Sequence, residues 1–375
     1  MKAFVIVPSI HKIDNLLKYY DNFSRFGHDT EFIIIDEYPS FQQVRDYNNE
    51  IFSKAGANYS FYGQKERKEW LDERGIDIGV IPERCHAETS FGFLIAWEHR
   101  DEYDLVIELD DDTYPMDSET DFLGWHWRTL SDGGNIEVYS KVLWVNPIDL
   151  CFKDQSIRFP RGFPYGIRPI YEYALKDKSW KSVINQGMWN GTFDLNAFDI
   201  LYEGCLTGNP DHLGDPNIGA SFGISPETYV TVCSMNCSFK PHIIPAFYQL
   251  YMNVPHAGLR VDRYDDIWSG IFLKKLLDIN NERMSFGEPF CHHAKTPRST
   301  FKDIKAELYG MEINEELWAL VNEYSSNKSD YTTLYRGLAD HLKKHARSRF
   351  GDFAPFIELQ TEKMTQWCNA IEIIE

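Results

Sequence analysis

The chain has 375 residues, of which 43% are hydrophobic, and its formal net charge is -19. This length can bury a sizeable core, in one large domain or in one domain with an appendage. A diffuse acidic surface repels nucleic acids and anionic membranes, so we expect neither as a default partner.

The cysteines and the hydropathy pattern favour a cytoplasmic protein. The seven cysteines are scattered and odd in number, as is typical of a reducing compartment. Met1 and Lys2 run directly into a strand pattern, so no signal peptide is expected. No apolar run approaches the roughly 20 residues of a membrane span, so no membrane insertion is expected.

Strand and helix patterns alternate over the first third of the chain. The expected strands cover residues 3–7, 31–35, 59–62 and 104–109, and the expected helices cover 13–26, 41–55 and 89–99. Such alternation predicts an α/β fold with a mostly parallel sheet flanked by helices. Ligands of such sheets lie at the carboxyl ends of the strands, where Ser9, Asp36 and the triplet Asp110 to Asp112 are expected.

The rest of the chain divides into an irregular middle and a helical end. Residues 113–260 are rich in Gly, Pro and aromatics and predict loops and short strands, and a helix is expected at 265–279. Further helices are expected at 302–309, 314–324, 331–347 and 356–374. We therefore predict a catalytic domain over residues 1–300 and a helical region over 301–375. This region would pack on the core or on another subunit, and a homo-oligomer is one assembly that it allows.

The aspartate triplet carries the strongest chemical signal. Asp110 and Asp112 follow an apolar strand, and alternate side chains of an extended backbone share a face. Adjacent carboxylates repel one another unless a cation neutralises them, and hard oxygen ligands suit Mg²⁺ or Mn²⁺. A solvated acidic turn is the alternative, but the position at a strand end favours a metal site.

Two other clusters add candidate residues. His293 could complete the coordination of Mn²⁺ and Lys295 could offset phosphate charge, although a lone His is more often structural. Asp265 and Asp266 begin the helix expected at 265–279. They either cap that helix, or one holds sugar hydroxyls while the other transfers a proton.

Arginines form the last cluster. Arg158, Arg161 and Arg168 bracket a segment rich in Gly and Pro, which predicts a shaped loop. Arginine suits bidentate recognition of phosphate, although surface salt bridges would explain the same residues.

In this order, the clusters resemble the reversibly glycosylated polypeptide family, whose plant members act as UDP-arabinopyranose mutases. The matching motifs are Asp110-Asp111-Asp112, Arg161-Gly162-Phe163-Pro164 with Arg168, residues 183–189, Cys233-Ser234-Met235-Asn236, and residues 263–270. The match extends over most of residues 3–307 and covers the helical tail poorly.

The resemblance implies a GT-A-like fold that binds a UDP-sugar or a related nucleotide-sugar with Mn²⁺ or Mg²⁺. Asp110, Asp112 and His293 would hold the metal, and Arg161 matches the arginine that becomes reversibly glycosylated. The implied substrate-binding residues are Ser9, Asp36, Asp110, Arg168, Asp194, Met235, Asn236, Arg263 and Lys295. Arg161, Asp265 and Asp266 are the candidate catalytic residues.

This sequence departs from the family pattern at two places. Pro8-Ser9-Ile10-His11 stands where the family has Pro-Thr-Ile-Arg, so a basic contact is expected to be lost. Asn190-Gly191-Thr192, shortly before Asp194, also differs from the family. Both departures bear on which sugar and base are bound more than on the class of enzyme.

The expected function is a UDP-sugar pyranose/furanose mutase with reversible self-glycosylation. The metal and an arginine would stabilise the diphosphate while the anomeric C–O bond breaks. A protonated guanidinium has no free lone pair, so Asp265 or Asp266 must assist Arg161, or Arg161 is only a phosphate clamp. The alternatives are a glycosyltransferase with a separate acceptor and a non-catalytic scaffold that binds sugar nucleotides.

Overall fold

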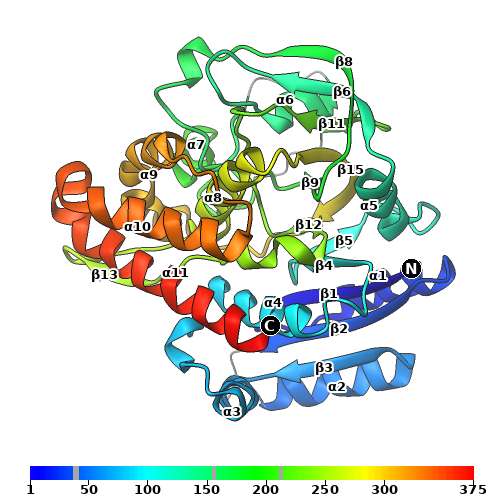
Figure 1. Cartoon of the computed structure of the whole chain (residues 1–375). Helices are drawn as coiled ribbons and strands as arrows, with labels where there is room; N and C mark the ends of the chain where they lie inside the picture. Colours follow the sequence, from blue (N-terminus) through cyan, green and yellow to red (C-terminus); the bar gives the residue numbers. More distant parts are fainter. Residues whose placement is uncertain (37–41, 154–157, 211–213) are drawn as a thin grey trace.

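The apolar runs of the first third form the parallel part of one large sheet (Figure 1). The computed structural model describes all residues except 37–41, 154–157 and 211–213. The strands of this part are β1 (Lys2–Ser9), β2 (Asp29–Asp36), β3 (Asn58–Tyr62) and β4 (Leu105–Leu109). They lie in the order β3-β2-β1-β4 and are parallel, with Ser9 beside Asp36 in the register.

Beyond β4 the sheet continues in mixed orientation. Its order is β4-β12-β9-β15-β11-β6-β8, and β5 pairs with β15. The strands are β5 (Thr113–Pro115), β6 (Gly134–Tyr139), β8 (Ala174–Trp180), β9 (Ile184–Gly191), β11 (Ser221–Ile224), β12 (Asn236–Phe239) and β15 (Met284–His293). Because β12 is antiparallel to both β4 and β9, and β15 is parallel to β9, strands β4, β9 and β15 point the same way.

Helices flank this sheet, as the alternation predicts. The helices before residue 300 are α1 (Asp14–Arg25), α2 (Gln42–Ala55), α3 (Gln64–Arg74), α4 (Ser90–Glu98), α5 (Phe122–Ser131), α6 (Pro147–Cys151), α7 (Ala197–Tyr202) and α8 (Asp265–Ile279). The expected helix at 41–55 is confirmed from Gln42 onward, and residue 41 lies outside the described residues. The α/β prediction is confirmed, while α3, α5, α6 and α7 were not expected.

Short strands and 3-10 helices alternate with the loops that connect the longer elements. They are the strands β7 (Phe152–Lys153), β10 (Asp215–Pro216), β13 (Val254–His256) and β14 (Leu259–Val261), and the 3-10 helices η1 (Ile78–Val80), η2 (His86–Thr89), η3 (Arg168–Ile170), η4 (Pro241–Ala246) and η5 (Gly351–Phe353). β9 is longer than the short strands expected here, because all eight of its residues are buried in the centre of the sheet.

The C-terminal region is helical, as predicted, and packs on the core of the same chain. It contains α9 (Thr300–Glu323), α10 (Tyr331–Phe350) and α11 (Ala354–Ile374). Trp367 of α11 is fully buried, and its indole donates to the carbonyl of Pro245 at 3.1 Å. In Figure 1, α11 lies across one side of the sheet and ends close to α4. The division at residue 300 stays a prediction, because one hydrophobic cluster includes residues of both regions.

The prediction of two helices at 302–309 and 314–324 is wrong. A single helix, α9, runs through Gly310. A Cβ at Gly310 would meet the Tyr264 ring at 2.2 Å, so the glycine serves close helix packing rather than a break.

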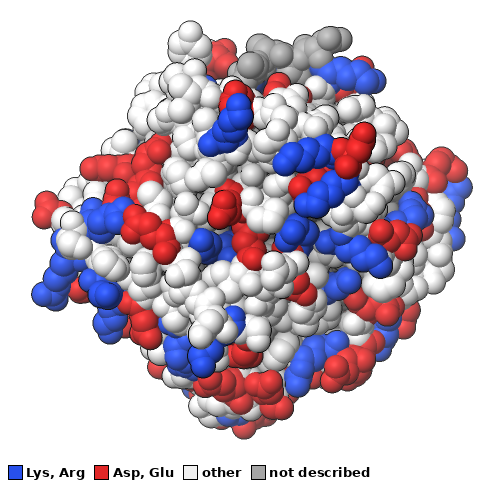
Figure 2. Space-filling view, turned by 45° about the horizontal axis from the view of Figure 1, so that its top comes forward, with Lys and Arg blue, Asp and Glu red and all other residues white. Residues whose placement is uncertain are grey.

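The parallel strands place the predicted ligand residues at one edge of the sheet. The carboxyl ends of β1, β2, β4, β9 and β15 lie at this edge, together with the beginning of the antiparallel β12. Figure 2 shows positive and negative side chains interspersed over the face that it draws, without a field of one sign. In the described part of the chain, no helix is long and apolar enough to cross a membrane.

Candidate active site

The aspartate triplet lies between β4 and β5, at the edge where Ser9 ends β1. Ligand oxygens of Asp110, Asp111 and Asp112 lie within 4.8 Å of one another. The Ser9 hydroxyl donates to Asp111 Oδ2 at 2.7 Å, and Nδ1 of His11 lies 3.0 Å from the same oxygen. An imidazole that contacts Asp111 thus stands at the position where the family has arginine, and the loss of the family's basic contact stays a prediction.

His293 faces Asp112 in an orientation that suits a metal ligand. Its Nδ1 donates to the carbonyl of Thr192 at 2.7 Å, and its Nε2 lies 3.4 Å from Asp112 Oδ2. A backbone acceptor on one ring nitrogen is the usual way to orient a ligating imidazole. Asp112 Oδ1 is buried and has no hydrogen-bond partner among the described residues. These groups fit a divalent cation that is bound by carboxylate and imidazole.

The electrostatics of the triplet show the cost of gathering three carboxylates. Burial, followed by the charge of Asp112, raises the pKa of Asp110 to about 7. Burial opposes the charge of Asp112 as well, but the hydrogen bond and charge of His293, together with the charges of Lys295 and His11, outweigh it and lower the pKa of this carboxyl. A bound cation would remove this repulsion and keep all three groups ionised.

Arg161 is the centre of a second cluster, which the sheet edge brings close to the first. Its Nε lies 3.0 and 3.1 Å from the two oxygens of Asp194, and its Nη2 lies 3.0 Å from Asp194 and 3.6 Å from Asp266. Its Nη1 donates to the carbonyl of Arg263. Burial opposes the charge, but Asp194, Asp266 and Glu307 outweigh it and raise the pKa of Arg161 well above its ordinary value. The guanidinium is therefore firmly protonated.

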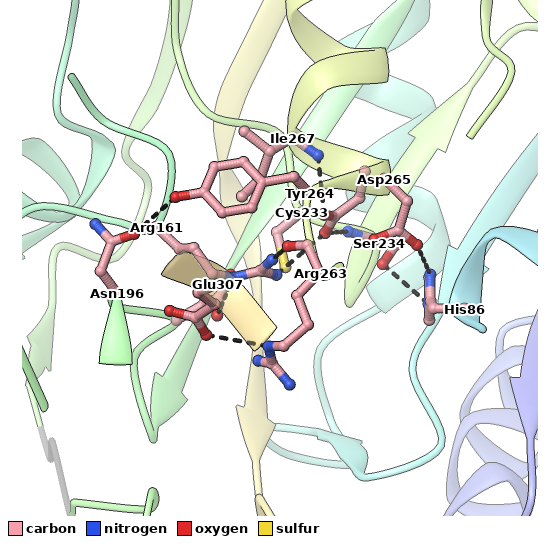
Figure 3. A network of polar contacts seen from close by, with 12 residues as sticks. His86, Arg161, Asn196, Cys233, Ser234, Arg263, Tyr264, Asp265, Ile267 and Glu307 are labelled. Atoms are coloured by element: carbon pink, nitrogen blue, oxygen red, sulfur yellow. Dashed lines mark hydrogen bonds and ion pairs between the residues drawn. The ribbon is translucent and has the colours of Figure 1, made fainter. Parts of the chain in front are cut away.

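Asp265 and Asp266 begin α8 and point to different partners. Asp266 faces Arg161, and Asp265 Oδ2 lies 3.2 Å from Nδ1 of His86 (Figure 3). Burial, followed by the charges of Asp265 and Asp194, raises the pKa of Asp266, although Arg161 opposes this shift. Burial acts on Asp265 too, but the hydrogen bond and charge of His86, together with the charge of Arg161, outweigh it and lower its pKa. Neighbouring carboxyls with opposite shifts suit two different roles.

Arg263 and Lys295 supply further positive charge beside Arg161. Arg263 has a left-handed backbone with φ of 64°, and its Nε lies 3.0 Å from Glu307 Oε1. Lys295 Nζ lies 3.8 Å from Asp303 Oδ2. Figure 3 shows Arg161 at the centre, with Glu307 and Arg263 on one side and Asp265 and His86 on the other. The first helix of the C-terminal region thus reaches the site through Asp303 and Glu307.

Asp36 lies at the same edge of the sheet, at the end of β2. Its Oδ2 lies 3.3 Å from Nε of Arg45, and its carbonyl accepts from Arg67 at 2.9 Å. A Cβ at position 63 would meet Asp36 Oδ1 at 2.6 Å, so Gly63 allows this close approach. Asp36 is thus held in place beside Ser9.

Three predicted substrate-binding residues are engaged elsewhere. Arg168 makes a bidentate ion pair with Asp199, with both distances 2.9 Å, and its guanidinium lies 3.8 Å from the Tyr165 ring centre. Asn236 is fully buried, and its amide bonds to His126 and to the carbonyls of Met188 and Pro289. Met235 is buried, and its carbonyl accepts from the backbone of Asp110 at 3.4 Å. The Arg168 guanidinium and the Asn236 amide are therefore paired within the protein.

The sequence patterns missed His86, Asp303 and Glu307. Asp303 and Glu307 are four residues apart on α9, and this spacing places both carboxylates on one helix face. The spacing is visible in the sequence and could have marked the pair as candidate partners of the basic residues. His86 stands in a short 3-10 helix, where no periodicity marks it.

Comparisons with known proteins show the family of the chain. The family model described as reversibly glycosylated polypeptide matches residues 3–375. Probable UDP-arabinopyranose mutase 4 of Arabidopsis thaliana is 21% identical over 98% of this chain and 90% of its own length. UDP-arabinopyranose mutase 1 of Oryza sativa subsp. japonica is 21% identical over 98% of this chain and 89% of its own length.

A solved structure also aligns with the chain. The mannosyltransferase PcManGT of Pyrobaculum calidifontis, in complex with GDP-Man and Mn²⁺, covers 98% of this chain at 11% identity, with 73% of its own chain covered and a TM-score of 0.33. At this score the likeness carries no argument about the site. The family match spans the whole described site, from Ser9 to Glu307, and continues through α11. The chain belongs to the reversibly glycosylated polypeptide family.

Proposed function

We propose that this protein is a metal-dependent nucleotide-sugar enzyme, and specifically a UDP-sugar pyranose/furanose mutase with reversible self-glycosylation. The observation that carries the proposal is the buried Asp112 oxygen without a partner, which lies beside His293 at the edge that also holds the Arg161 cluster. The relatives named UDP-arabinopyranose mutase support the choice of substrate class.

Asp110, Asp112 and His293 are the residues that would hold Mn²⁺ or Mg²⁺. The cation would supply charge neutralisation for the diphosphate of the nucleotide-sugar. The Ser9 hydroxyl and His11 both contact Asp111 and fix the orientation of this carboxylate beside the proposed metal ligands. Asp36 and Ser9, at the ends of adjacent strands, are assigned to the nucleotide.

Arg263 and Lys295 are assigned to the diphosphate oxygens. Glu307 holds Arg263 through Nε, and Asp303 lies near Lys295. Burial lowers the pKa of Lys295, and an anionic ligand would favour its charged form. We therefore expect these two side chains to draw a phosphate into an otherwise acidic protein.

Asp265 and Asp266 are assigned to the sugar. The lowered pKa of Asp265 keeps it an ionised acceptor for sugar hydroxyls, while the raised pKa of Asp266 makes it the better proton carrier. Arg161 lies against Asp266 and Asp194. For Arg161 to carry the sugar, the anomeric C–O bond must break with UDP as the leaving group, while a new C–N bond forms and the proton of that nitrogen passes to one of these carboxylates. Otherwise Arg161 acts as a clamp.

A glycosyltransferase with a separate acceptor would use the same residues, and a scaffold would bind without turnover. Incubation with a panel of UDP-sugars and Mn²⁺, without an acceptor, separates the three. A mutase yields a rearranged nucleotide-sugar and a transferase yields slow hydrolysis or no reaction, whereas the scaffold binds tightly and leaves the ligand intact. Product chromatography and intact-protein mass are the measurements, with EDTA-treated enzyme as the control. Recovery of only unchanged UDP-sugars would refute the mutase.

We also infer that the protein works in the cytoplasm. All seven cysteines are free, and five of them are buried, as suits a chain that folds in a reducing compartment. We further propose that any homo-oligomer uses the exposed faces of the C-terminal helices, since their apolar faces already pack on this chain.

A further inference from the structure

His86 connects two groups of the proposed sugar site. Its Nδ1 lies 3.2 Å from Asp265 Oδ2 and 3.1 Å from Gln249 Oε1, and its Nε2 lies 3.2 Å from Ser234 Oγ. Figure 3 shows the imidazole between Asp265 and Ser234, on the side of the network opposite Glu307. The His86 side chain is 29% exposed, so part of the imidazole is accessible to solvent.

The partners of His86 define where its protons lie. Both neighbours of Nδ1 are oxygen acceptors, so Nδ1 carries a proton. The Gln249 amide nitrogen donates to the buried Glu108, which turns the Gln249 oxygen toward His86. The titratable groups whose charges act on the imidazole are Asp265, Asp110 and Glu108, and the charge of Asp266 is coupled to it more weakly. Burial opposes a charge on His86, but these groups outweigh it and raise its pKa well above the ordinary value.

A charged imidazole changes what Ser234 can do. With protons on both nitrogens, Nε2 donates to the Ser234 oxygen, so the hydroxyl proton of Ser234 points to another acceptor. The backbone nitrogen of Ser234 already donates to Asp266 Oδ2 at 3.4 Å, which holds the residue in place. Ser234 is thereby an O–H donor beside two carboxylates, and a sugar oxygen is the ligand that such a set would hold.

We propose that His86 is a positioning residue, which keeps Asp265 ionised and oriented and leaves the Ser234 hydroxyl as a donor to the bound sugar. The role in sugar binding rests on the proposed function, whereas the coupling between imidazole and carboxylate is a property of the protein alone. Two measurements therefore test the two parts separately.

The coupling is measured by NMR titration of the histidine rings in the full-length protein. In Asp265→Asn the pKa of His86 should fall by at least about one unit, because an opposite charge at this distance is worth that much. Asp266→Asn is the matched control, since it removes a neighbouring carboxylate that does not contact His86. An unchanged titration in Asp265→Asn, or an equal shift in both variants, would overturn the proposal whatever the enzyme's activity.

The role in catalysis is measured by the pH profile of kcat/KM with a UDP-sugar. Loss of the imidazole in His86→Ala should raise the pKa of Asp265 and so shift the acidic limb of the profile to higher pH by about one pH unit. His86→Asn keeps an N–H donor near the position of Nδ1 and should recover part of the activity. His242→Ala removes an imidazole that pairs with Glu282 far from the site and should leave the profile unchanged.

The outcomes separate the two proposals. A wild-type enzyme that turns over, with an acidic limb that His86→Ala leaves in place, would overturn the role of His86 and spare the function. A wild-type protein that turns over no nucleotide-sugar would overturn the function, while the NMR titration would still decide the coupling. Melting temperatures of all variants show whether a loss of activity reflects unfolding.

Discussion

His293 and Asp112 face each other at 3.4 Å, although 180 residues separate them along the chain. β15 brings the imidazole, and the turn after β4 brings the carboxylate. The backbone carbonyl of Thr192 holds Nδ1, so Nε2 and the unpartnered Asp112 Oδ1 are the groups left for a cation.

We predict that Asp112→Asn weakens Mn²⁺ binding by at least about tenfold, because it removes a charged ligand. Isothermal titration calorimetry with Mn²⁺ measures the change. Asp177→Asn, an exposed substitution of the same kind on β8, should bind Mn²⁺ like the wild type. Equal affinities for the wild type and Asp112→Asn would place the cation elsewhere.

We predict that Arg161→Ala destabilises the protein by about 3–5 kcal/mol, because it leaves the buried Asp194 and Asp266 without their cation. Urea unfolding measures this free energy. Arg347→Ala, which removes an exposed partner of Glu358, should change it by less than about 1 kcal/mol.

Arg161→Lys separates the two roles of this residue. A clamp keeps much of its activity as lysine, whereas a sugar carrier loses turnover. In the wild type a carrier also shows a mass increase of one sugar after incubation with a UDP-sugar. Activity of Arg161→Lys close to that of the wild type would contradict the self-glycosylation that we propose.

We predict that acid destabilises the protein partly through His126. Burial lowers the pKa of this imidazole to about 3, although its hydrogen bond to Asn236 opposes the shift. Nε2 donates to Asn236 and Nδ1 accepts from Asn185, an arrangement that only the neutral ring satisfies. The unfolded chain gains a proton below about pH 6.5, so this stability is present above that pH and is lost as the pH falls toward 3.

The measurement is the free energy of unfolding between pH 4.5 and 6.5. As the pH falls, the free energy of unfolding of His126→Gln should decrease less steeply than that of the wild type. The two slopes should differ by up to about 1.4 kcal/mol per pH unit. His242→Gln, at an exposed position, should follow the wild type. Parallel curves for the wild type and His126→Gln would show that His126 does not titrate in this way.

We predict that Trp367→Ala costs about 3–5 kcal/mol and that the chain still unfolds in one transition. Trp367 is fully buried, stacks on Tyr248 and donates to Pro245, so α11 is part of the main core. Calorimetric melting checks both statements, and Tyr202→Ala, at a side chain that is 94% exposed, should change little. A separate low-temperature transition would show that residues 301–375 fold as an independent domain.

Local patterns predicted much of this fold, because the apolar residues of strands and helices recur every two to four residues, and a short stretch of sequence shows this repeat. The strands that end at Ser9, at Asp36 and just before Asp110 lie where expected, and the helices expected in the first third match within a few residues. The prediction erred where a distant contact decides the outcome. Gly310 stays helical because the Tyr264 ring leaves no room for a Cβ, and no neighbour in the sequence shows this.

The sequence by itself determined which chemical groups the protein has: the aspartate triplet, the arginines and the carboxylates that begin α8. It also determined that the aspartate triplet follows a strand. Only the tertiary structure decided their partners. It took Arg168 and Asn236 into contacts with Asp199 and His126, and it added His86 and Glu307 to the site. The physical reason is that hydrogen bonds and ion pairs act over a few ångströms, and the order of the strands and the packing of helices on them decide which distant residues come that close.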